Sequence, residues 1–109
     1  MIYIDEEHEN KFNELMSKMK CKDSYHTAFA YLITMDYGCR CHISQIFDIE
    51  DDSIKDCFDK SWMTDSSRRS VTLAFALWNS FYKADINDIF NYSNEYNPYY
   101  VQAIQLRFH

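Results

Sequence analysis

Residues 65–83 read DSSRRSVTLAFALWNSFYK, and this stretch decides the fold class. Its large apolar residues recur at the i, i+3, i+4 and i+7 spacing that places side chains on one face of an α-helix. Asp65, Ser66 or Ser67 is expected to supply the oxygen that caps the helix. A helix this apolar must be surrounded by others, so we expect it to be the central element of a small helical domain, with Trp78 among the most buried side chains. The stripe consists of Val71, Leu73, Ala74, Phe75, Leu77, Trp78, Phe81 and Tyr82.

The composition favours a single all-α domain over residues 1–109. The chain is 47% hydrophobic and 17% aromatic, which supplies enough apolar surface for one core and argues against disorder. One Gly and one Pro are too few for the many tight turns of a β-sandwich or barrel. We therefore predict a compact bundle of about four main helices plus short ones, preceded at most by a short extended segment over residues 1–4.

The net charge of −6 limits the kinds of partner that the chain is expected to bind. Direct binding to nucleic acid usually depends on a basic face that releases counterions, and no basic run is present. An acidic chain is better suited to a partner protein with a basic surface, unless the charge serves solubility alone.

The hydrophobic pattern predicts no membrane segment. No apolar run approaches the roughly 20 residues that span a bilayer, and the initial residues, MIYIDEEHE, lack the basic start of a signal peptide. We therefore expect a cytoplasmic protein, in which thiols stay reduced. The four cysteines are Cys21, Cys39, Cys41 and Cys57.

Two helices are expected before the only glycine, Gly38. Asp5 is suited to cap the first, which runs to about residue 19, and the second runs from about 23 or 24 to 36. Gly38 follows directly, where a helix often ends on a left-handed residue. The inward positions of the two helices are His8, Phe12, Leu15, Met16, Met19, Tyr25, Ala28, Phe29, Leu32 and Ile33.

The remaining chain is expected to add short helices and one longer C-terminal helix. Residues 39–63 suggest two short helices, around 43–47 and around 53–58, and Asp85 is suited to cap another after the long helix. Asn97-Pro98 is typical of a helix start, since proline fits the first turn. The expected inward residues are Ile43, Ile46, Phe47, Ile54, Cys57, Phe58, Trp62, Ile86, Ile89, Phe90, Val101, Ile104 and Phe108.

We predict neither a metal site nor a cofactor. Cys39, Cys41 and His42 offer thiolates and an imidazole, but structural zinc sites usually place two to four residues between paired cysteines, and here one residue separates them. The acidic run 48–59 lacks the glycine and the bidentate glutamate that a calcium loop requires at positions six and twelve.

The histidines and arginines are expected to have structural roles. His8 and His26 lie on or near apolar helix faces, where packing or capping is the ordinary function, and neither a nucleophile nor a Gly-rich phosphate loop accompanies them. Arg68 and Arg69 are expected to pair with the acidic residues of 48–59, or otherwise to form a small anion site.

Several short patterns resemble a family of small uncharacterised proteins found in Gram-positive bacteria and in their phages and prophages. The likeness extends over most of the chain, although residues 39–63 match poorly. It implies a phage or mobile-element setting and transfers no catalytic residue. The matching patterns are Asp5-x-Glu7-His8-x-x-x-Phe12, Thr27-Ala28, Ser66-Ser67-x-Arg69, Leu73-Ala74-x-x-Leu77-Trp78-Asn79 and Gln102-Ala103-Ile104-x-Leu106-Arg107.

The function suggested by these features is that of a non-enzymatic accessory protein, similar to an anti-CRISPR, that inhibits a host nucleic-acid-handling or defence protein. An acidic face would compete with phosphates for the partner's basic residues. Two alternatives remain: a structural or regulatory homodimer that uses an aromatic surface, and a small enzyme that uses His8 or His26. The residues of the acidic face are Asp48, Glu50, Asp51, Asp52, Asp56 and Asp59, and the aromatic surface comprises Tyr92, Tyr96, Tyr99 and Tyr100.

Overall fold

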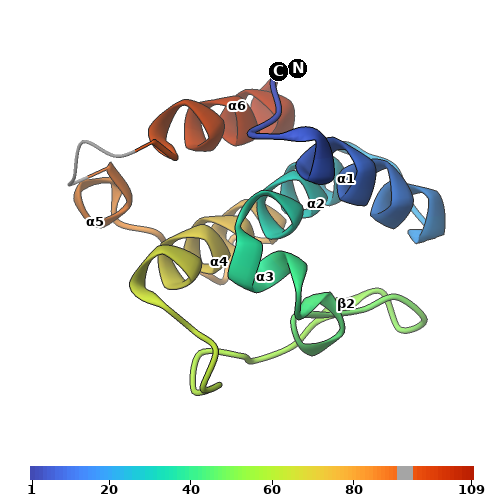
Figure 1. The fold of residues 1–109 in the computed structure, drawn as a ribbon, viewed down its shortest axis with the longest axis horizontal. Coiled ribbons are helices and arrows are strands. Elements are labelled where there is room, and N and C mark those ends of the chain that lie inside the picture. Colours follow the sequence, from blue (N-terminus) through green and yellow to red (C-terminus); the bar gives the residue numbers. More distant parts are fainter. Residues whose placement is uncertain (91–94) are drawn as a thin grey trace.

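The computed structural model describes residues 1–90 and 95–109 and confirms a mostly α-helical fold (Figure 1). A single two-stranded antiparallel sheet interrupts the helices within these ranges. The elements in chain order are α1 (Glu6–Lys18), α2 (Ser24–Met35), α3 (Tyr37–Arg40), η1 (Ile43–Gln45), β1 (Phe47–Asp48), β2 (Ser53–Ile54), α4 (Asp65–Trp78), α5 (Ile86–Phe90) and α6 (Asn97–Phe108).

Helix α2 is the central element, which corrects the prediction that residues 65–83 form the centre. It packs against α1, α4 and α6, and Figure 1 shows it enclosed by the other helices. The physical reason is that α2 has almost no polar face, whereas α4 keeps Arg68 and Thr72 on an outer side. Nine residues of α2 are buried: His26, Ala28, Phe29, Ala30, Tyr31, Leu32, Ile33, Thr34 and Met35.

The first two helices begin where predicted, at the predicted cap Asp5 and at the predicted start near residue 23 or 24. The Asp5 carboxylate accepts a hydrogen bond from the backbone N–H of His8 at 2.7 Å, and Asp23 accepts one from that of His26 at 2.9 Å. Most of the predicted inward residues of α1 and α2 are buried or partly buried. Tyr25 is the exception at 42% exposed, because it lies at the surface beneath the Arg107 guanidinium, 3.5 Å from the ring centroid.

Helix α4 is shorter than predicted and ends at Trp78. Its cap is Thr64, whose hydroxyl accepts from the backbone N–H of Ser67 at 3.1 Å. At the other end, the side chain of Asn79 accepts from the N–H of Phe81 at 2.9 Å, and this local bond competes with another helical turn. Phe81 is therefore 83% exposed rather than inward. Trp78 is only partly buried, so the expectation that it is among the most buried residues is wrong.

Gly38 does not end α2 in a left-handed conformation. Helix α2 stops at Met35, Asp36 is extended, and Gly38 lies inside α3 with a negative φ. The glycine is needed for space, because a Cβ atom at this position would lie 2.6 Å from the Oγ of Ser67 on α4. The single glycine therefore does mark a structural requirement, but the requirement is the close approach of α3 to α4 rather than the end of a helix.

Residues 47–54 form a β-hairpin where the sequence predicted the start of a second short helix. Phe47 pairs with Ile54 and Asp48 with Ser53, and Asp52 in the turn has a φ of 54°. The predicted helix around 43–47 is reduced to the 3-10 turn η1. Phe47 and Ile54 still contact the core, as predicted. They do so as partners across the hairpin, so the helical spacing of the apolar residues around them arose by chance.

Helix α6 buries residues other than those predicted, although the predicted Ile104 is partly buried against the core. Pro98 lies in its first turn, as expected, but Tyr100 and Ala103 are its buried residues. Val101 is 47% exposed and Phe108 is 69% exposed. The Tyr100 hydroxyl lies 2.9 Å from that of Ser70 in the interior, and this polar contact with α4 fixes the rotation of the helix.

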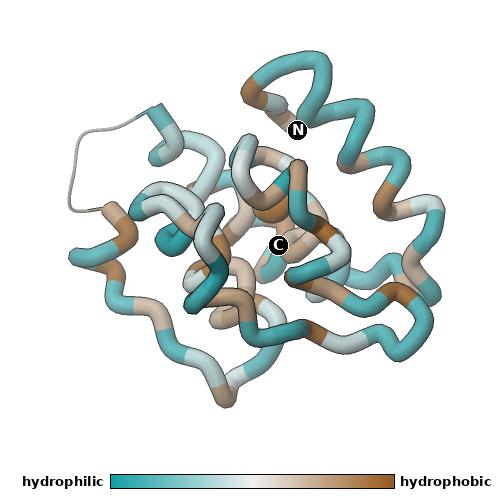
Figure 2. The backbone as a smooth tube through the Cα atoms, turned by 60° about the horizontal axis from the view of Figure 1, so that its bottom comes forward, coloured by the Kyte–Doolittle hydropathy of each residue, from teal (hydrophilic) through white to brown (hydrophobic). Residues whose placement is uncertain are grey.

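Along the described part of the backbone, hydrophobic stretches are short and alternate with hydrophilic residues (Figure 2). Within the described ranges, no helix is both long enough and apolar enough to cross a membrane.

Candidate functional site

The acidic residues predicted as a binding face lie on the β1–β2 hairpin and on the segment that follows it. Four of the six are exposed and two, Asp48 and Asp52, are partly buried. Six carboxylates and the single cation Lys55 give residues 48–59 a net charge of −5, out of −6 for the whole chain. The exposed members are Glu50, Asp51, Asp56 and Asp59.

The hairpin turn has internal hydrogen bonds that hold its shape. The Asp48 carboxylate accepts from the backbone N–H of Asp51 at 3.0 Å, and the Asp51 carboxylate accepts from the hydroxyl of Ser53 at 3.0 Å. These bonds leave further lone pairs of both carboxylates available to a partner. The turn therefore presents its charges from a defined backbone conformation.

Asp52 is partly buried and its carboxylate contacts His26, so it does not belong to the exposed face. Its carboxylate lies 2.8 Å from Nε2 of His26, and the opposite ring nitrogen, Nδ1, lies 2.7 Å from Asp23. Burial alone lowers the pKa of His26, but hydrogen bonds to Asp23 and Asp52 outweigh burial and raise it. The His26 backbone and side-chain N–H groups lower the pKa of Asp23. The imidazole thus joins the hairpin to the start of α2.

The basic side chains near the hairpin contact mainly carbonyl oxygens. Lys20 donates to the carbonyl of Glu50, and Lys55 donates to that of Ser44 at 2.9 Å. Arg68 donates to the carbonyl of Phe58 at 3.3 Å and lies over its ring. Among the ion pairs of residues 1–90 and 95–109, none joins Arg68 to residues 48–59, so the pairing predicted for Arg68 does not form.

Arg69 contacts α6. It hydrogen bonds to the side chain of Tyr100 and helps to lower the pKa of that hydroxyl, against the larger effect of burial, which raises it. It also lines a surface cavity of about 440 Å³ together with Arg68 and Lys83. Asp85 and Asp88 share this lining, so the cavity is of mixed charge rather than a dedicated anion site.

A second cavity, of about 510 Å³, lies where α3, the start of α4 and Tyr96 meet. Its walls carry a stacked pair of rings, His42 and Trp62, whose centroids are 4.4 Å apart. The buried carboxylate of Asp36 accepts from the hydroxyl of Ser67 at 2.6 Å. The Ser67 hydroxyl donates to this carboxylate and Nδ1 of His42 lies 2.8 Å from the carbonyl of Gly38, so these hydrogen bonds give each group a partner other than the opposite member of a nucleophile–base pair.

Gly38→Ala should destabilise the protein by about 1–3 kcal/mol, the range typical of an overpacked interior. The new methyl group would lie 2.6 Å from the Ser67 hydroxyl and displace it from its bond to Asp36. The measurement is urea unfolding of the variant. In a Ser67→Ala background the same change should cost less, and an equal cost in both backgrounds would contradict the steric explanation.

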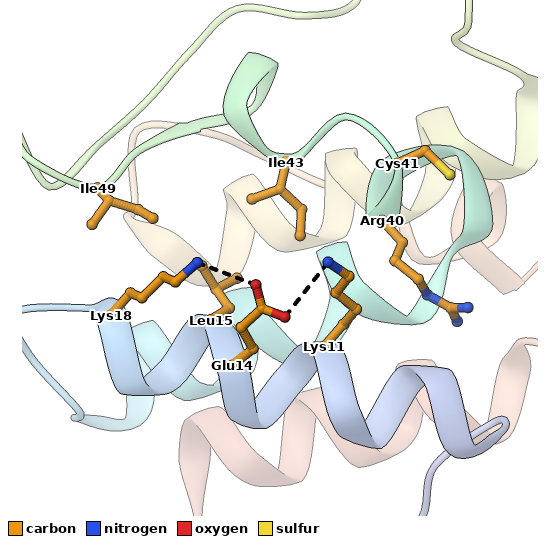
Figure 3. Close-up of a pocket in the computed structure, with 8 residues that line it drawn as sticks. All are labelled: Lys11, Glu14, Leu15, Lys18, Arg40, Cys41, Ile43 and Ile49. Atoms are coloured by element: carbon orange, nitrogen blue, oxygen red, sulfur yellow. Dashed lines mark hydrogen bonds and ion pairs between the residues drawn. The ribbon is translucent and has the colours of Figure 1, made fainter.

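A third cavity, of about 240 Å³, separates α1 from the segment after α3 (Figure 3). Glu14 lies between Lys11 and Lys18 and pairs with both, at 3.5 and 3.1 Å, as the dashed lines in Figure 3 show. Arg40 binds the carbonyls of Thr34 and Met35 at the end of α2. The cations around this cleft are therefore already engaged within the protein.

His8 has the structural role that was predicted for it. Its Nδ1 accepts from the N–H of Ile4 at 3.1 Å and its Nε2 donates to the carbonyl of Tyr31 at 2.9 Å. Burial is the main reason that its pKa falls to about 4. A wholly buried imidazole with both nitrogens occupied has no access to a substrate, so the enzyme alternative would depend on His26.

The cysteines considered for zinc lie in different environments. Cys39 and Cys57 are fully buried, and burial raises the pKa of the Cys57 thiol to about 11 and that of Cys39 further. Cys41 is exposed. The Cys39–Cys41 pair therefore does not face one point in space. Among the described residues, the structure instead brings together Cys21, His26 and Asp52, a set that sequence spacing did not reveal.

The aromatic surface proposed for a homodimer is largely internal where the structure describes it. Tyr100 is fully buried, and Tyr96 and Tyr99 are partly buried against the core. Burial and the neighbouring Asp36 carboxylate raise the pKa of Tyr96 to about 12. Tyr92 lies outside the described residues.

Comparison with known protein families gives one match over residues 1–109, to a family of unknown function, DUF6075. The chain belongs to this family. No curated protein and no solved structure matches it. The family confirms that the resemblance was to an uncharacterised domain, and the phage setting stays a prediction.

Proposed function

We propose that the protein is a non-enzymatic phage or mobile-element accessory protein that binds and inhibits a host nucleic-acid-handling or defence protein. The binding face is the exposed acidic group Glu50, Asp51, Asp56 and Asp59. The phage setting is supported only by the sequence patterns described above. The choice of a basic protein surface as the partner is supported by the charge of residues 48–59.

The observation that carries this proposal is the concentration of charge in one short stretch of chain, the hairpin and the segment that follows it. Residues 48–59 have a net charge of −5, and Lys20, Lys55 and Arg68 donate to carbonyl oxygens rather than to these carboxylates. A partner can therefore approach exposed carboxylates without displacing internal ion pairs. Such a face steers association with a basic protein, and the effect weakens as salt screens the charges.

The test compares two variants with the same change in charge. Glu50→Gln, Asp51→Asn and Asp56→Asn remove three charges from the face but retain oxygen acceptors for the local bonds. Asp52 is left intact because it holds His26. The control replaces Glu6, Glu7 and Glu9 by Gln in the exposed first turn of α1.

The partner is first isolated by affinity pulldown from the natural host and then titrated at low and moderate salt. The face variant should bind roughly tenfold or more weakly, mainly through slower association, and the control should bind like wild type. Equal affinities for wild type and face variant, without salt dependence, would exclude this face. Sedimentation would then test the homodimer.

A further inference from the structure

The loop between α1 and α2 and the turn of the hairpin bring three side chains of different chemistry to one point. The Sγ of Cys21, a ring nitrogen of His26 and a carboxylate oxygen of Asp52 all lie within 4.8 Å of one another. Cys21 and Asp52 are 31 positions apart in the sequence, so only the packing of the hairpin against α2 creates this cluster. We propose that Cys21, His26 and Asp52 bind one divalent transition-metal ion of the zinc type.

His26 is held in the orientation that a ligand requires. Asp23 lies 2.7 Å from its Nδ1, and the ring packs edge-on against Trp78 with centroids 4.8 Å apart. The opposite nitrogen, Nε2, therefore points at Asp52. A histidine that binds a metal through one nitrogen typically donates the other N–H to a carboxylate, which is the role that Asp23 already fills.

Asp52 is held toward the same point by an unusual backbone conformation. Its φ of 54° is the single positive value among non-glycine residues of the described ranges. For such a residue this conformation costs about 1 kcal/mol or more. The hairpin turn requires this conformation, which Asp tolerates better than most residues, and in it the carboxylate lies 2.8 Å from His26.

The three donors match the chemistry of zinc. A thiolate, an imidazole and a carboxylate are all common zinc ligands, and a site with three protein ligands keeps a fourth position for water. If His26 and Asp52 formed a salt bridge alone, the nearby thiol of Cys21 would have no role, whereas a metal site uses all three groups. The exposure of Cys21 gives the ion a path from solvent. The adjacent Lys22 is turned to the carbonyls of Met16 and Met19, which keeps its charge off the cluster.

Binding requires two adjustments. The Sγ of Cys21, which is up to 4.8 Å from the other ligand atoms, must come to about 3.5 Å from each of them. Two ligand atoms on a tetrahedral zinc ion with bonds of about 2.0 Å lie roughly 3.3 Å apart, and Nε2 of His26 is now 2.8 Å from Asp52. The hairpin turn must move outward by about half an ångström. The ion replaces the proton shared by His26 and Asp52 and the proton of the Cys21 thiol, and both protons leave to solvent.

The test uses the purified full chain, with Zn²⁺ titrated in competition with a coloured chelator and Co²⁺ as a spectroscopic probe. One equivalent should bind, and Co²⁺ should show a thiolate-to-cobalt charge-transfer band. Cys21→Ser should abolish the band and weaken binding more than tenfold. Asp23→Asn should keep the band but weaken binding by about 10–100-fold.

Cys41→Ser is the matched control, because it removes another exposed thiol and should leave both readings unchanged. Circular dichroism of each variant verifies that the fold is retained; Cys21 and Cys41 are both exposed and neither is expected to be needed for folding. Binding of equal strength in wild type and Cys21→Ser, or cobalt binding without a thiolate band, would show an adventitious ion and overturn the proposal. If no metal ion binds, His26 and Asp52 form only a salt bridge, and the proposal is also overturned. The result does not depend on the partner-binding face.

Discussion

Phe29→Ala should lower the free energy of unfolding by about 3–5 kcal/mol, a large share of the stability of a domain of this size. Phe29 is completely buried on α2. Its ring centroid lies 5.0 Å from that of Trp78, 5.4 Å from Phe47 and 6.2 Å from Phe75, so it joins α2 to the hairpin and to α4. Urea unfolding followed by circular dichroism measures the loss.

The matched control is Phe81→Ala, which removes the same atoms from a side chain that is 83% exposed. Its effect should stay within about 0.5 kcal/mol, as is usual for surface positions. Similar losses for the two variants would mean that α2 is not the centre of the core. A loss confined to Phe81→Ala would restore the longer α4 that the sequence predicted.

The parts of the fold that could be predicted are those determined by local chemistry. Asp5 and Asp23 mark the helix starts because an aspartate side chain satisfies an unpaired N–H within three residues of itself. Pro98 marks the first turn of α6 for a similarly local reason. The class prediction followed from the scarcity of turn residues, and the structure agrees with it.

The errors arise where tertiary contacts decide between local alternatives. Residues 53–58 have apolar spacing that suits a helix, yet Ile54 pairs with Phe47 across a hairpin. Asn79 ends α4 through a bond from the N–H of Phe81 that the apolar stripe does not reveal. Gly38 is the only glycine in the chain, but the residue that requires it, Ser67, lies 29 positions away in the sequence. The sequence alone therefore does not show why a glycine is needed there.

The residues around His26 also divide into those that local sequence could predict and those that only tertiary contacts determine. The helix start near Asp23 could be predicted, and so could a packing or capping role for His26, but the contact between the Asp23 carboxylate and the His26 ring was not predicted. Asp52 was assigned to the acidic face because its sequence neighbours are acidic. Only the hairpin turns it away from them and toward His26, with Cys21 close by. A cluster drawn from a loop, a helix and a turn has no fixed sequence spacing to recognise.

Between pH 6.5 and 4, acidification should remove about 3 kcal/mol of stability through His8 alone. An ordinary histidine in the unfolded chain has a pKa near 6.5, whereas burial lowers the pKa of His8 in the fold to about 4. Below pH 6.5 the unfolded chain therefore binds a proton that the folded protein does not bind until about pH 4. Stability is fully present above 6.5 and falls by about 1.4 kcal/mol for each pH unit below it.

The contribution of His8 is isolated by comparing the wild type with His8→Gln over this range. Glutamine can still donate to the carbonyl of Tyr31, the bond that Nε2 makes now, but it does not titrate. His26 and Asp23 also titrate, and their effects are the same in both proteins and cancel in the difference. The gap in unfolding free energy should narrow as the pH falls, because only the wild type must keep an imidazole uncharged. A gap that stays constant between pH 7 and 4 would show that His8 takes up its proton at the same pH in the folded and the unfolded chain. The pKa would then not be lowered by burial, and the neutral form that accepts the bond from Ile4 would not persist below pH 6.5.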